Sequence, residues 1–200
     1  MGVKNDYEQL EIESAAELRA WLAANHGQRE GVWVVRFKQH VAGKHVSWDE
    51  IVDEALCWGW IDSLARRLDD ERTMQVLTPR REGSGWSALN KRRVERLTAE
   101  GRMMAPGMEA IERAKADGSW TVYDEVEALV IPEDLAAALA ENGEARRYFE
   151  AFSSSAKKGI LWWIKSAKRR DTREKRIAET ARLAARNLRA NHPEARDFEG

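Results

Sequence analysis

All the residue runs typical of β-strands lie in the first 80 residues of this 200-residue chain. Residues 31–37 (GVWVVRF) are β-branched and aromatic, and residues 60–68 and 73–78 share that character, with a polar turn sequence at 69–71 between the last two runs. An isolated hairpin is only marginally stable in water, so we expect these runs to share one sheet. The sequence therefore predicts a small antiparallel sheet of about three strands.

Helix signals flank these runs and dominate the rest of the chain. Ser47 and Glu50, for example, have the spacing of a capping box, in which the hydroxyl and the carboxylate each bind a free backbone N–H of the first turn. The second half of the sequence is helical almost throughout. The prediction is a helix-rich α+β protein, with an α+β domain at residues 1–118 and a helical C-terminal region at residues 119–200 packed on it.

Composition excludes several classes of protein. Cys57 is the one cysteine, which rules out an intramolecular disulfide and fits a reducing compartment. The polar N-terminus does not have the apolar run of a signal peptide, and no stretch has the length of a membrane span, so a cytoplasmic protein without a membrane partner is expected. The four histidines show no metal-ligand spacing, and no cofactor motif is present. The oligomeric state stays open.

The charges are distributed unevenly. Residues 157–189 carry 12 basic and 3 acidic groups, whereas residues 1–156 carry 20 and 28. Basic residues interleaved with aromatic ones suit a nucleic acid, because cations meet phosphates while rings stack on bases. The alternative is that the basic block pairs with acidic residues of the same chain. The candidate nucleic-acid residues are Lys157, Lys158, Lys165, Lys168, Arg169, Arg170 and Arg173.

Residues 55–63 (ALCWGWIDS) form the first candidate functional segment. A helix that ends at Gly59 and leads into a strand would place Trp58, Trp60 and Asp62 at an element junction, where a cleft forms easily. Asp62 could then act as an acid or base, or bind a guanidinium. The alternative is that both tryptophans fill the core and Asp62 caps a turn.

Residues 78–97 form the second candidate segment. Arg80 and Arg81 precede a Gly-Ser-Gly-Trp loop that opens onto a helix, so Ser84, Ser87 and the first backbone N–H groups could cradle an anion while an arginine binds it. The segment does not have the ending of a P-loop. An N-cap serine and a packed Trp86 would explain the same residues.

These segments carry a family resemblance. The stretches GVWVVRFK, ALCWGWIDS, TPR with SGWSALNKRRVERL, GRMMAPG, and the long FSSSAKKGILWWIKSAKRRDTREKRIAET resemble the bacterial YdeI/OmpD-associated, or bacteriocin-protection, family over most of residues 20–185. The resemblance implies a small bacterial cytoplasmic protein associated with protection against antimicrobial peptides and with an outer-membrane porin. It implies no catalytic residues.

Three functions remain as hypotheses. The leading one is a non-catalytic binding or stress-protection protein that accepts a small anionic or aromatic ligand. The second is a nucleic-acid-binding protein that uses the basic C-terminal helices, and the third is a small-molecule enzyme with Asp62 as general base. For the leading hypothesis, the residues expected to line the ligand pocket are Trp58, Asp62, Arg80, Trp86 and Asn90.

Overall fold

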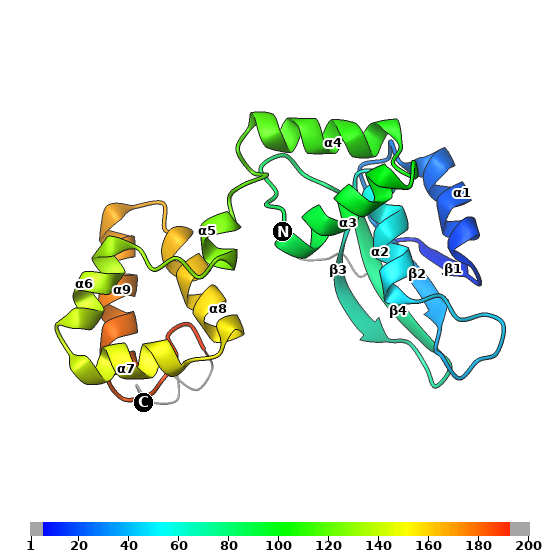
Figure 1. Cartoon of the computed structure of the whole chain (residues 1–200). Coiled ribbons are helices and arrows are strands. Elements are labelled where there is room, and N and C mark those ends of the chain that lie inside the picture. The colour runs from blue at the N-terminus through cyan, green and yellow to red at the C-terminus, as the bar shows by residue number, and fades with distance from the viewer. Residues whose placement is uncertain (1–5, 193–200) are drawn as a thin grey trace. The chain divides into compact units, whose positions relative to one another are not determined.

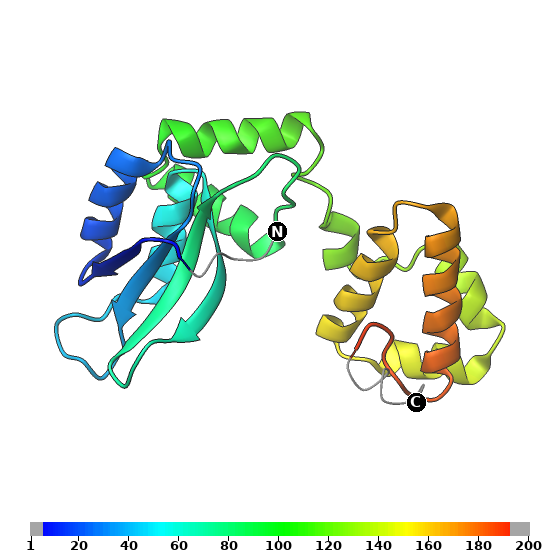
Figure 2. The ribbon, with the colours of Figure 1, turned by 180° about the vertical axis from the view of Figure 1, so that it is seen from behind.

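The computed structural model describes residues 6–192, which form two compact units (Figures 1 and 2). The units are Met1–Val122 and Tyr123–Gly200. This division falls near residue 118, where the sequence placed its boundary, and the packing of the second region on the first stays a prediction. The first unit contains β1 (Gln9–Ile12), α1 (Ala15–Asn25), β2 (Val32–Phe37), α2 (Trp48–Cys57), β3 (Trp60–Arg67), β4 (Arg72–Pro79), α3 (Ala88–Ala99) and α4 (Ala105–Ala116).

The sheet of the first unit has four strands in the order β1-β2-β4-β3. The α+β class is confirmed, and the hairpin between β3 and β4 forms as predicted. The sequence predicted about three strands, and β1 is the additional one. It pairs with β2 in parallel, so the sheet is mixed rather than purely antiparallel. With four residues, QLEI, it is too short and too polar to stand out as a strand in the sequence.

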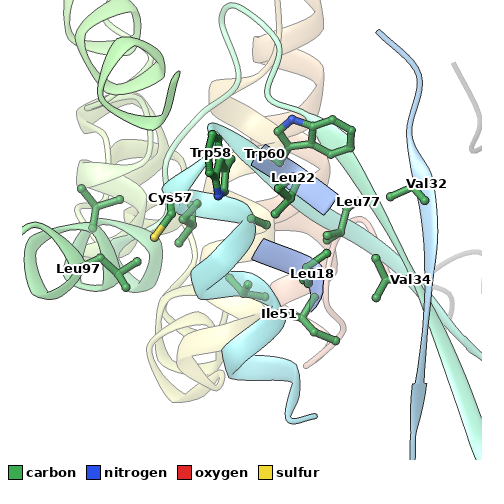
Figure 3. Packing of buried hydrophobic residues seen from close by; sticks show 14 of the residues in the cluster. Leu18, Leu22, Val32, Val34, Ile51, Cys57, Trp58, Trp60, Leu77 and Leu97 are labelled. Atoms are coloured by element: carbon green, nitrogen blue, oxygen red, sulfur yellow. The ribbon is translucent and has the colours of Figure 1, made fainter. Parts of the chain in front are cut away.

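One face of the sheet packs against the helices and forms the main core. Leu18 and Leu22 of α1, Ile51 of α2 and Leu97 of α3 meet the strand residues Val32, Val34 and Leu77 there (Figure 3). Trp58 and Trp60 belong to this core, with 8% and 1% of their surface exposed. The other face carries a second buried cluster of Trp33, Val35, Met74 and Val76.

The second unit is helical and encloses a core of its own. It contains α5 (Asp124–Glu127), α6 (Glu133–Ala140), α7 (Gly143–Ala151), α8 (Ser154–Lys165) and α9 (Arg170–Ala184). Leu135 and Leu139 of α6, Phe149 of α7 and Ile164 of α8 are among its buried residues. Between residues 6 and 192, no helix is both long enough and apolar enough to cross a membrane.

Two buried carboxylates on α2 join three segments of the first unit. Asp53 and Glu54 are 6% and 4% exposed, and each accepts hydrogen bonds from two arginines on neighbouring segments. A buried charge is stable only when it is paired and hydrogen-bonded, so these contacts fix α1, α3 and the loop after α3 around α2. The bonds are Arg19 to Glu54 (2.9 Å), Arg102 to Glu54 (2.7 Å), Arg93 to Asp53 (2.9 Å) and Arg96 to Asp53 (2.6 Å).

Removing one of these charges should destabilise the first unit. Glu54→Gln leaves Arg19 and Arg102 without their anion, and because those arginines are partly exposed we expect a loss of about 2 kcal/mol, below the range for a fully buried pair. Urea titration followed by circular dichroism measures it. The control is Glu112→Gln, which breaks an exposed pair with Lys115 and should cost about 0.5 kcal/mol or less. Equal losses in the two variants would refute the role of Glu54.

Two glycines let the start of α4 approach the end of α2. A Cβ on Gly107 would lie 2.3 Å from the carbonyl oxygen of Cys57, and Gly59, with φ of +75°, would place a Cβ 2.8 Å from the carbonyl oxygen of Pro106. The Met104 N–H donates to the Cys57 carbonyl at 3.1 Å. Backbone therefore packs on backbone at this junction, which only glycine permits.

Gly107→Ala should destabilise the protein by about 1–3 kcal/mol, because the methyl group must push one backbone segment away from the other. The free energy of unfolding in urea measures this loss. Gly27→Ala is the matched control in the same unit, since nothing lies within 4 Å of a Cβ placed there. If both variants have the same stability, the close approach at Gly107 is not a constraint on the fold.

Candidate functional site

The loop between β4 and α3 holds Arg80 against Trp86. The guanidinium carbon lies 3.7 Å from the centroid of the indole, and Nη1 donates to the Ser84 hydroxyl at 3.3 Å and to the Gly85 carbonyl at 3.2 Å. Arg80 is 9% exposed and Trp86 is 1% exposed. This loop therefore presents a stacked, nearly buried arginine in a defined position.

Arg80 and Trp86 line a small hollow, which we call the arginine hollow. Its wall carries three guanidinium groups, from Arg80, Arg81 and Arg113, together with the hydroxyl residues Ser84 and Ser119. The space is about 10 Å³, roughly that of a single water molecule. No aromatic ring fits inside it.

Asp117 connects the hollow's loop to the end of α4. One carboxylate oxygen accepts from the Ser119 N–H at 2.8 Å, and the other accepts from the Gly83 N–H at 3.0 Å. The Ser119 side chain, with these N–H groups, holds the pKa of Asp117 below its ordinary value. Its charge is thus compensated by N–H donors.

The five predicted ligand residues do not all line this hollow. Arg80 and Trp86 do, whereas Trp58, Asp62 and Asn90 lie elsewhere in the first unit. Trp58 packs in the core beside His26, with 5.0 Å between ring centroids. Asn90 is half-buried in the first turn of α3. A ligand-binding role of these residues stays a prediction.

Asp62 lies in β3 beside a bulge in its pairing with β4. It accepts a hydrogen bond from the Gln75 amide at 2.9 Å. Burial raises the pKa of Asp62, although the hydrogen bonds to its carboxylate oppose that shift. A half-buried carboxylate with a raised pKa is what a general base needs. Asp62, however, does not line the arginine hollow.

The alternative readings of residues 84–87 also have structural support. Ser87 is the N-cap of α3, and its hydroxyl accepts from the Asn90 N–H at 3.2 Å. Trp86 packs on Trp120, with 5.0 Å between ring centroids. Capping and packing thus explain Ser87 and much of Trp86, while Arg80 and Ser84 still face the hollow.

The candidate nucleic-acid residues mostly pair with carboxylates of their own unit. Residues 123–156 carry eight acidic and two basic groups, a net charge of −6 that offsets part of the +9 of residues 157–189. Lys157 donates to the Glu150 carbonyl, and Lys168 and Arg169 are exposed. The ion pairs are Lys158 to Glu127 (2.5 Å), Lys165 to Glu125 (2.7 Å), Arg170 to Glu174 (2.7 Å) and Arg173 to Asp134 (2.7 Å).

Three residues of the hollow were missed in the sequence. Arg113, Asp117 and Ser119 come from the end of α4 and the segment after it, about 30 residues beyond Arg80. Nothing in their local pattern marks them, because they reach the hollow only through the path of α4. Within residues 6–192, no group of three or more histidine, cysteine, aspartate or glutamate residues could hold a metal ion.

The fold and the hollow define a two-unit α+β protein with an arginine-lined surface site on its first unit. Half of the chain, residues 10–110, matches the family described as "Domain of unknown function (DUF8412)", and the chain belongs to that family. Residues 128–187 match OmdA, described as "Bacteriocin-protection, YdeI or OmpD-Associated", which confirms the resemblance for the C-terminal stretch, whereas the earlier stretches lie within the DUF8412 match. No curated protein and no solved structure matches the chain.

Cys57 should make the free energy of unfolding fall as the pH rises through the alkaline range. Burial, followed by the charge of Glu54, raises the pKa of its thiol from 9.0 to about 11. The folded state therefore favours the protonated thiol. The contribution of this thiol to the free energy of unfolding is intact below pH 9 and is lost between pH 9 and 11. At pH 10.5 we expect a loss of about 2 kcal/mol relative to pH 8. Urea titrations at both pH values test this, with Cys57→Ala as control; an equal pH dependence in the variant would contradict it.

Proposed function

We propose that this chain is a non-catalytic binding protein whose first unit holds a small oxyanion, such as phosphate or sulfate, at the arginine hollow. The carrying observation is that Arg80, Arg81 and Arg113 surround one hollow together with the hydroxyl residues Ser84 and Ser119. Guanidinium groups bind oxyanions through charge-assisted hydrogen bonds, and the Ser84 hydroxyl, which accepts from Arg80, can donate its own hydrogen to the same oxygens.

The size of the hollow supports an anion rather than an aromatic ligand. A space of about 10 Å³ admits one oxygen-sized atom, so an oxyanion would rest over the mouth with one oxygen inward.

The charge balance around the hollow supports the same ligand. Glu82 and Asp117 also line it, against three arginines. The carboxylate of Asp117 is already engaged by N–H donors, as described above. Within residues 6–192, Arg113 pairs with the exposed Glu109 at 3.9 Å, and such a pair contributes little. Three arginines and two carboxylates thus leave the lining with a formal charge of +1.

The wider role follows from the family. Bacteriocin protection stands in the description of the family matched at residues 128–187, and it supports a part in stress protection for this chain. We place that role in the cytoplasm as part of the same proposal. The nucleic-acid hypothesis stays second. Four of its seven side chains are ion-paired within the second unit, and a nucleic acid would have to displace these weak, partly exposed pairs. The enzyme hypothesis with Asp62 as base stays a prediction.

Calorimetric titration with sodium phosphate and sodium sulfate at low ionic strength tests the proposal. We expect binding at millimolar concentrations, and about tenfold weaker binding in Arg113→Gln, because one charge-assisted contact is lost. Arg146→Gln is the control, since it changes an exposed arginine of the second unit that pairs with Glu150. Absence of anion binding in the unaltered protein, or equal weakening in the control, would refute the proposal.

A further inference from the structure

Trp120 extends the arginine hollow with an aromatic ring. It directly follows Ser119, which lines the hollow, and its backbone N–H donates to the Ala114 carbonyl at 2.9 Å. Its ring lies 5.0 Å from that of Trp86, which carries the guanidinium of Arg80. Trp86 is sealed, whereas Trp120 is only half-buried. A partly exposed indole therefore adjoins the anion site.

Two further cations approach this ring. The Nζ atom of Lys91, in α3, lies 5.3 Å from the centroid of Trp120, and that of Lys115, in α4, lies 5.9 Å from it. Lys115 also pairs with Glu112 at 2.9 Å, but both side chains are exposed and such pairs are weak. Three cations thus lie beside the packed pair of indoles, of which Trp120 is the partly exposed one.

We propose that the anion bound here belongs to a nucleotide, with phosphate groups at the arginine hollow and a base stacked on Trp120. This inference rests on the proposed oxyanion function and adds the identity of the ligand. Any of the bases can stack on an indole, because each has an aromatic face, and neighbouring lysines bind the remaining phosphate charge.

The charge of the first unit favours a mononucleotide over a nucleic-acid strand. Residues 1–122 carry 18 basic and 20 acidic groups, so the unit is slightly acidic as a whole. A strand requires a positive groove that follows its backbone over several nucleotides, whereas a mononucleotide needs positive charge only where its phosphates lie. The cations described here surround one hollow and one ring.

Calorimetric titrations with ATP and with inorganic tripolyphosphate distinguish the contribution of base stacking on Trp120 from that of phosphate binding. We expect ATP to bind about tenfold more tightly, because only ATP has a base to stack. In Trp120→Leu the two affinities should become equal while tripolyphosphate binding is unchanged. Trp120→Phe, which keeps an aromatic ring, should retain part of the difference. Trp48→Leu is the control, since it removes another partly exposed indole of the same unit.

The outcomes distinguish this inference from the proposed function. Equal affinities for ATP and tripolyphosphate in the unaltered protein would overturn the nucleotide inference and leave the oxyanion function intact. Absence of binding by phosphate, tripolyphosphate and ATP would overturn both. A single-stranded oligonucleotide that binds much more tightly than ATP would replace the mononucleotide with a strand.

Discussion

The pairing of two adjacent buried carboxylates on α2 with arginines from its neighbours is the interaction on which the first unit depends. Glu54 binds α1 and the loop after α3, and Asp53 binds two turns of α3 itself. Glu100 joins the two sets, since it pairs with both Arg96 and Arg102. Because α3 follows directly after the Arg80–Trp86 loop, its fixed position also fixes that loop. The arginine hollow is therefore supported by charges that never touch it.

The sequence predicted the features that depend on short-range chemistry. The capping box of Ser47 and Glu50 forms as expected, with both reciprocal hydrogen bonds present. Arg80 and Trp86 were also expected at one site, and they lie in one loop with five residues between them. In contrast, β1 is defined by its pairing with β2, and its four residues carry no signal of their own. Long-range partners decide such a strand, and local propensity does not.

The candidate site was only partly predictable for the same reason. For residues 55–63 the sequence left a cleft and a core position open, and Trp58 and Trp60 are core residues that pack around α2 (Figure 3). The aromatic residue that packs on Trp86 is Trp120, which lies after α4 and far from Trp86 in the sequence. For the basic helices, the sequence revealed one part of the interaction and not the other. Their charge was visible in the sequence, but their partners, such as Glu125 and Asp134, became evident only from the fold.

Each unit encloses its own buried cluster, and the two matched families cover separate stretches of the chain on either side of residue 122. The two interiors are therefore formed by side chains from separate stretches of the sequence. The segment between the two matched stretches still contributes to both interiors, because Ile111 and Ala114 pack in the first core and Val126 packs in the second.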